Sequence, residues 1–66
     1  MVYTVKQARC LKEKTQKEMA DLMGISRDSY RKIEREPGKA TVQQAYKISR
    51  ITGIPVDQIF FADKST

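Results

Sequence analysis

The sequence lacks several residue types on which whole classes of function depend. It contains no histidine and no tryptophan, and Cys10 is its single cysteine. One cysteine cannot form an internal disulfide, and without histidine a zinc site of the usual Cys/His type is excluded. No apolar run is long enough to span a membrane, and the first ten residues lack the apolar stretch of a signal peptide. We therefore expect a cytoplasmic protein that has no metal site and no contact with a membrane.

A chain of 66 residues allows one domain, and we expect residues 1–66 to form it. A domain of this size buries only about 60% of the surface that its unfolded chain exposes, so its core is small. It leaves little room for the deep cleft that most enzymes use. The sequence also has no nucleophile–base arrangement, no paired carboxylates and no phosphate-binding glycine loop. We therefore expect no enzymatic activity, no cofactor and no small-molecule substrate.

Basic residues outnumber acidic ones, and the excess is unevenly distributed. The chain has 13 Lys and Arg against 8 Asp and Glu, a net charge of +5. Residues 1–39 hold ten basic and six acidic side chains, whereas residues 40–66 hold three and two. A basic surface attracts polyanions, so the first two thirds of the chain are the expected binding region.

The sequence predicts an all-α fold. Three segments open with a Thr followed three positions later by Gln or Glu, the capping-box pattern that starts helices: Thr4–Gln7, Thr15–Glu18 and Thr41–Gln44. Ser26 is a fourth candidate cap, Gly24 and Gly53 suit helix ends, and Pro55 suits the start of a helix. We expect helices over residues 5–13, 16–23, 27–35, 42–52 and 56–61.

Apolar residues at helical spacing predict a single core. The expected core residues are Met19, Ala20, Met23, Ile25, Tyr30, Ile33, Val42, Ala45, Ile48, Ile54, Val56, Ile59 and Phe60. We interpret Cys10 as a small packing residue of the first helix rather than a redox switch.

Residues 16–35 have the pattern of a helix-turn-helix, in which the second helix can enter a major groove. The side of helix 27–35 opposite Tyr30 and Ile33 is polar and cationic. Arg27, Arg31 and Arg35 repeat at i, i+4, a spacing at which like charges weaken a helix slightly. A polyanion would offset that repulsion. The alternative is an ordinary solvated face, supported by the possible pairs Asp28–Lys32 and Lys32–Glu36.

A family resemblance favours the first interpretation. The stretch QKEMADLMGIS over residues 16–26 is followed by Tyr30, Ile33 and Glu34, then Thr41 and VDQIFF over residues 56–61. This spacing resembles the phage-repressor family of the Xre/Cro type (lambda-repressor-like), from about Val5 to Phe61. The resemblance implies a compact five-helix bundle that binds double-stranded DNA. Glu13-Lys14, Pro55 and Thr52 depart from the common pattern of the family.

The resemblance also assigns roles to individual residues. It implies base contacts from Arg27, Asp28 and Lys32, and the chemistry agrees, since Arg and Lys can donate to guanine and Asp can accept from cytosine. Asp28 could instead stabilise the helix N-terminus or hold Lys32. The implied flank or phosphate contacts are Gln16, Lys17, Ser26, Ser29, Arg31, Arg35, Gly38 and Lys39. Gln16 could also be no more than the second residue of a capping box.

Two further assignments concern structure and assembly. Arg9 and Glu34 resemble an ion pair of the family that orients the recognition helix, and Glu34 on the core side would be costly if unpaired. The family usually acts as a two-fold dimer, and residues 54–62 are the candidate interface, with Val56, Ile59, Phe60 and Phe61. The alternative for Phe61 is that it covers the edge of the core.

The most direct functional hypothesis is a sequence-specific transcriptional regulator, a repressor that binds a pseudo-palindromic operator as a homodimer. The alternative is an antitoxin or another protein-interaction module of the same fold, whose main partner is a protein. A phage or mobile-element repressor and a restriction-modification controller remain open within the first hypothesis. In either case we expect a cytoplasmic protein, and DNA binding would associate it with a bacterial or phage nucleoid.

Overall fold

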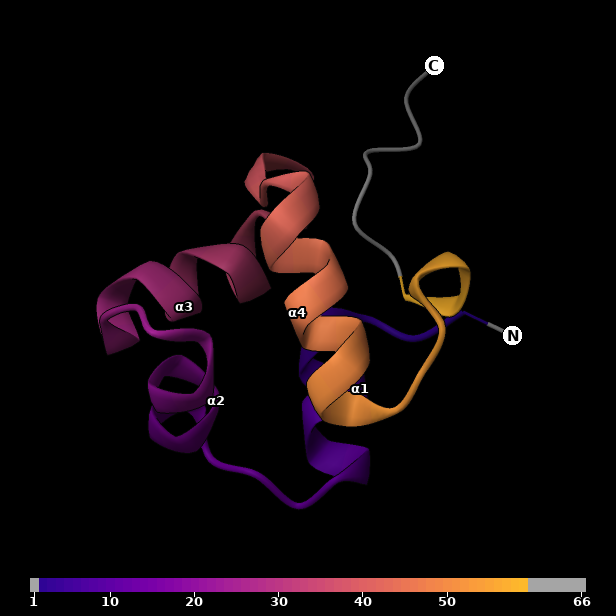
Figure 1. Cartoon of the computed structure of the whole chain (residues 1–66), viewed down its shortest axis with the longest axis horizontal. Coiled ribbons are helices and arrows are strands. Elements are labelled where there is room, and N and C mark those ends of the chain that lie inside the picture. The colour runs from indigo at the N-terminus through magenta and orange to yellow at the C-terminus, as the bar shows by residue number, and fades with distance from the viewer. Residues whose placement is uncertain (1, 60–66) are drawn as a thin grey trace.

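The computed structural model describes residues 2–59, and they form four α-helices joined by turns (Figure 1). The helices are α1 (Val5–Leu11), α2 (Gln16–Met23), α3 (Arg27–Arg35) and α4 (Val42–Thr52). Two single-turn 3-10 helices complete the order, η1 (Pro37–Lys39) after α3 and η2 (Val56–Gln58) after α4. The prediction of an all-α fold is confirmed, and the bounds expected for α2, α3 and α4 are those observed.

The predicted caps account for this agreement. Each of the three Thr caps forms a complete capping box: the hydroxyl accepts from the backbone N–H three residues on, and that residue's side chain accepts from the Thr N–H. In α2 the two bonds join Thr15 and Glu18 at 3.0 and 2.7 Å. Ser26 caps α3 through a single bond from the Ser29 N–H at 3.1 Å. Gly24 and Gly53 end α2 and α4 in the left-handed conformation.

The first helix is shorter than predicted. We expected it to run over residues 5–13, but α1 ends at Leu11, with Lys12 as its C-cap. Glu13 then adopts a φ of +56°, the left-handed region that glycine occupies at little cost. The side-chain periodicity continues through this segment, but its backbone has already left the helix. The turn places the Lys14 carbonyl 2.9 Å from the Arg9 guanidinium.

The predicted fifth helix over residues 56–61 is wrong in its described part. The chain forms only the η2 turn, and no side chain caps its start at Pro55. Ile59 is extended and forms an isolated parallel β-bridge with Tyr3, whose N–H donates to the Gln58 carbonyl at 2.8 Å. This tertiary contact holds Gln58 and Ile59 against the N-terminal segment. Phe60 and Phe61 lie outside the described residues.

The core lies where the four helices meet, and α1 contributes more to it than predicted. The buried apolar residues are Val5, Ala8, Met19, Ala20, Met23, Tyr30, Ile33, Ile48 and Ile59. Ile25 and Ile54 are half-buried against them, as are Tyr3, Ala40 and Ile51. Val42 was predicted in the core but is 71% exposed, because it is the first residue of α4 and lies on its outer side. Ala45 and Val56 are only half-buried.

Two further positions differ from simple packing expectations. Cys10 is exposed, so its interpretation as a packing residue is wrong; Ala8 has the buried position on α1 instead. Thr52 is completely buried, and its hydroxyl donates to the Ile48 carbonyl at 2.8 Å. Because its own helix satisfies this hydroxyl, a polar residue is accommodated in the core.

Candidate nucleic-acid interface

The α2–turn–α3 unit is built by short-range interactions. Gly24 turns the chain, and the Ile25 N–H donates to the Ala20 carbonyl at 3.0 Å, so the turn is bonded back to α2. Ser26 then caps α3 immediately. Tyr30 and Ile33 on the inner side of α3 are buried, which holds the helix on α2 and leaves the opposite side open to solvent. Figure 1 shows α2 and α3 together on one side of α1 and α4.

The three residues predicted to contact bases all lie on that outer side. Arg27, Asp28 and Lys32 are exposed, and within residues 2–59 neither Arg27 nor Lys32 forms an ion pair. The possible pair Asp28–Lys32 is not formed; Asp28 instead lies 4.0 Å from Arg31, with 89% of its side chain exposed. An ion pair so long and so exposed contributes little to stability. The donors of Arg27 and Lys32 are therefore available to a ligand.

The predicted flank and phosphate residues occupy different places around α3. Ser26 and Ser29 share a hydroxyl–hydroxyl bond of 3.0 Å at the helix start. Lys17 lies on α2 and pairs with Asp21 at 3.1 Å, both exposed. The other predicted contacts that are exposed on or after α3 are Arg31, Arg35, Gly38 and Lys39.

A shallow hollow brings several of these groups together. It lies between the outer side of α3, η1 and the start of α4, and its lining residues are Ser29, Lys32, Ile33, Arg35, Glu36, Lys39 and Gln44. Three of them are cations, and the one carboxylate, Glu36, lies 3.3 Å from the Lys39 ammonium. The three cations come from α3 and η1, and together they form a cationic wall along one side of α3.

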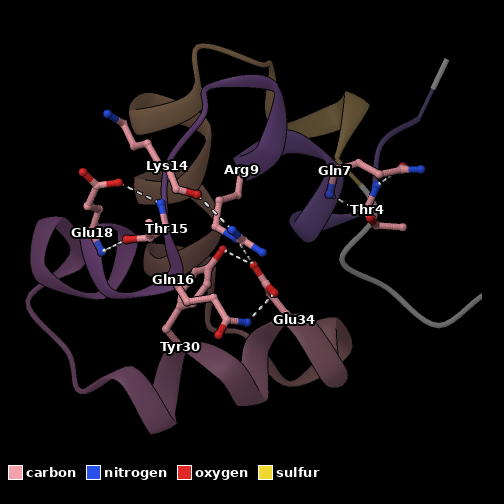
Figure 2. Close-up of polar contacts among 9 residues, drawn as sticks. All are labelled: Thr4, Gln7, Arg9, Lys14, Thr15, Gln16, Glu18, Tyr30 and Glu34. Carbon is pink, nitrogen blue, oxygen red and sulfur yellow. Dashed lines mark hydrogen bonds and ion pairs between the residues drawn. The ribbon is translucent and has the colours of Figure 1, made fainter.

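The opposite side of α3 contains a compact polar cluster, which we call the Glu34 hub (Figure 2). The predicted ion pair is present: Arg9 Nε lies 2.6 Å from Glu34 Oε2, and the two side chains are only 12% and 8% exposed. Glu34 also accepts from the Tyr30 hydroxyl at 2.6 Å and from the Gln16 amide at 2.9 Å. Arg9 in turn donates to the Lys14 carbonyl. One carboxylate therefore joins α1, α2 and α3.

Burial and hydrogen bonding act in opposite directions on these groups. Burial by itself would raise the pKa of Glu34, but the hydrogen bonds from Arg9, Tyr30 and Gln16 outweigh it and hold the pKa below its ordinary value. Burial, followed by the bond to Glu34, raises the pKa of the Tyr30 phenol. The bond to Glu34 raises the pKa of Arg9 despite its burial. All three groups thus keep their usual charge states near neutral pH.

The hub also shows what sequence reasoning missed. Gln16, predicted as a flank or phosphate contact, donates to Glu34 and so joins α2 to α3. The Tyr30 hydroxyl was not anticipated as a partner, because Tyr30 was considered only as a core residue. Its position four residues before Glu34 was the available signal, since residues at i and i+4 lie on one side of a helix.

The candidate dimer segment is only partly described. Val56 is half-buried, and Ile59 is 4% exposed because it packs in the core of its own chain. Ile59 therefore offers little surface to a second copy. Phe60 and Phe61, the other residues of the predicted interface, lie outside the described residues.

Residues 2–59 contain no group of three or more His, Cys, Asp or Glu side chains that could hold a metal ion. Over the same range, no helix has the length and apolar character needed to cross a bilayer.

The fold and the exposed second helix define a helix-turn-helix protein. The family model described as Helix-turn-helix, of the Xre and lambda-repressor-like type, matches residues 5–59, and the chain belongs to this family. It is a family of DNA-binding regulators, whose members are not typically enzymes. Neither the comparison with curated proteins nor that with solved structures gave a significant match.

Proposed function

We propose that this protein is a sequence-specific double-stranded DNA-binding regulator, a repressor that binds a pseudo-palindromic operator as a homodimer. The observation that carries the proposal is the outer side of α3. In a chain of the helix-turn-helix family, Arg27, Asp28 and Lys32 are exposed there on a helix whose inner side is buried. A repressor of this kind acts by occupying a promoter, which requires affinity and specificity but no chemical step.

The proposed base contacts follow from hydrogen-bonding chemistry. The Arg27 guanidinium can donate two parallel bonds to O6 and N7 of guanine, and the Lys32 ammonium can donate to the same atoms. Asp28 can accept from N4 of cytosine. Each contact of this type discriminates against a wrong base by about 1–3 kcal/mol, so three of them can specify a short half-site.

Phosphate contacts would fix the position of α3 in the groove. Lys39 and Arg35 in the cationic hollow, and Lys17 on α2, carry charges suited to the DNA backbone. Ser26, Ser29, Gly38 and Arg31 are the further flank contacts of the proposal. Such contacts add affinity on every sequence and make it fall with salt.

Dimer formation through residues 54–62 is the second part of the proposal. The half-sites of a two-fold dimer would lie about one helical turn, roughly 34 Å, apart. Two adjacent Phe residues, Phe60 and Phe61, follow Ile59, which already packs in the core. We expect Phe61→Lys to lower both the mass observed in analytical ultracentrifugation and the affinity for the operator. If both stay unchanged, this segment is not the interface.

The competing proposal is a protein-interaction module, such as an antitoxin, for which DNA binding is secondary. An exposed apolar surface favours such a partner, and α4 presents exposed Val42 and Tyr46. The cationic outer side of α3 favours DNA instead, because DNA is a polyanion. A neutral or acidic surface at this place would have favoured the protein partner. In either role we expect the protein in the bacterial cytoplasm.

The decisive experiment is in vitro selection from a random duplex library at about physiological salt. Specific binding should exceed non-specific binding by about 10³-fold or more. We expect enrichment of a pseudo-palindrome with half-sites one helical turn apart. Binding without enrichment, which disappears as salt rises, would contradict the proposal and favour the protein partner.

A further inference from the structure

A second hollow lies on the other side of α3, where α1 approaches it. Its lining residues are Lys6 of α1, Gln16 of α2, and Arg31, Glu34 and Arg35 of α3. Three elements of the chain thus contribute to one surface depression. Lys6 is not part of the helix-turn-helix, and nothing in its sequence context distinguishes it from the other lysines. Only the packing of α1 against α3 brings it to this place.

The charges around this hollow are unbalanced. Lys6, Arg31 and Arg35 are exposed cations, whereas the only carboxylate in the lining is Glu34. Both Glu34 oxygens already accept bonds within the hub, one from Gln16 and the other from Arg9 and Tyr30. Within residues 2–59, no carboxylate lies within ion-pair distance of Lys6 or Arg35, and Arg31 has only the distant contact with Asp28.

Gln16 adds a directed donor to these charges. Its side-chain amide has two N–H groups, and the hub uses one of them in the bond to Glu34. The bond also sets the direction of the amide plane. Gln16 and the three cations line the same hollow, and together they form a set of hydrogen-bond donors and positive charges suited to a phosphate.

We propose that this hollow binds a phosphate of the DNA backbone and that Lys6 is a DNA-contacting residue of α1. The inference rests on the proposed function, because it takes α3 to be the helix in the groove. Each of the two hollows is lined by three cations, and Arg35 lines both, so a cationic wall runs along each side of α3. The two walls would face the two phosphate backbones that border a major groove about 12 Å wide. α1 thus takes part in the interface, in addition to α2 and α3.

The test is the salt dependence of DNA binding by Lys6→Ala, with Lys12→Ala as the matched control. Both substitutions remove one lysine from the α1 region, but Lys12 lies at the other end of α1, beside Gly53. For Lys6→Ala we expect the slope of log K against log salt to fall by about 0.9, with the ratio of specific to random binding unchanged. Lys12→Ala should retain the wild-type slope, and so should Lys6→Arg.

A phosphate scan then identifies the partner of Lys6. Single methylphosphonate substitutions, which remove one backbone charge at a time, are placed along a duplex that the protein binds. At one position per half-site the substitution should weaken wild-type binding and have a clearly smaller effect on Lys6→Ala. If Lys6→Ala has the wild-type slope and no position behaves in this way, the inference is wrong. That result leaves the proposed function intact, which would fail instead if the wild-type protein selected no sequence.

Discussion

The two sides of α3 use charge in opposite ways. On the side facing α1 and α2, Glu34 is 8% exposed and accepts bonds from Arg9, Tyr30 and Gln16 (Figure 2). On the outer side, Arg27 and Lys32 are exposed, and no ion pair within residues 2–59 involves them. The first set of groups is satisfied within the fold. The second still has its hydrogen-bonding capacity free for a partner.

This difference separates structural charges from binding charges better than residue type does. An unpaired buried charge is costly, so the Glu34 hub must be complete for the domain to be stable. An exposed lysine or arginine contributes little to stability and is free to bind a ligand. Variants of the hub should therefore change folding, and variants of the outer side should change binding without changing folding.

The largest expected effect is on Glu34. Glu34→Ala leaves the largely buried Arg9 guanidinium without its carboxylate partner and the Tyr30 hydroxyl without its acceptor. We expect the free energy of unfolding, measured by urea denaturation with circular dichroism, to fall by about 3 kcal/mol. Glu36→Ala is the control, because Glu36 is exposed and within residues 2–59 pairs only with Lys39, so its loss should cost at most about 0.5 kcal/mol. If Glu34→Ala and Glu36→Ala lower the free energy of unfolding equally, the distinction between structural charges and binding charges is wrong.

The next effect is on binding by the outer side. Arg27→Ala and Lys32→Ala should each weaken binding to the selected operator by about 1–3 kcal/mol and relax its sequence preference at one or two base pairs. Unfolding curves should stay unchanged, since both side chains are exposed. Lys39→Ala serves as the comparison and should weaken all sequences alike, with a salt slope lower by about 0.9. Equal losses on operator and random DNA for Arg27→Ala would contradict a base-reading role.

A smaller effect is expected in the turn that supports the hub. Glu13 has a φ of +56° and precedes Lys14, whose carbonyl accepts from Arg9. Glu13→Gly should relieve the strain of the left-handed conformation and stabilise the protein by about 1 kcal/mol in thermal or urea unfolding. Gly53→Ala makes the opposite change, because it places a side chain at a φ of +73°, and it should destabilise the protein. A loss of stability in Glu13→Gly would show that the Glu13 side chain has a role of its own.

The smallest effect is the acid dependence of the hub. The pKa of Glu34 is lowered in the folded state, so the stability it contributes is complete above its unfolded pKa of about 4.3 and is lost as pH falls through the folded value. The stability difference between wild type and Glu34→Gln should therefore shrink below about pH 4.3. The pKa of Glu18 is also lowered, but Glu18 is present in both proteins, so its contribution cancels in the stability difference.

Much of the fold was predictable because its helix starts are encoded locally. Thr15, Ser26 and Thr41 bond to residues three positions along the chain, and the helices that follow them have the predicted bounds. The ion pair between Arg9 and Glu34 could be expected only from the family resemblance. Its further bonds to Tyr30 and Lys14 required the structure, because they depend on how the helices pack.

The sequence by itself determined the positions of α2, α3 and α4, the buried side of α3 and its cationic outer side. These features depend on caps and periodicities that act within a few residues. Only the tertiary structure decided that Ile59 pairs with Tyr3, that Val42 and Cys10 are exposed, and that Lys6 lines a hollow together with Arg31 and Arg35. Each of these features depends on contacts between segments far apart in the chain. Local sequence patterns do not predict the free energy of such contacts.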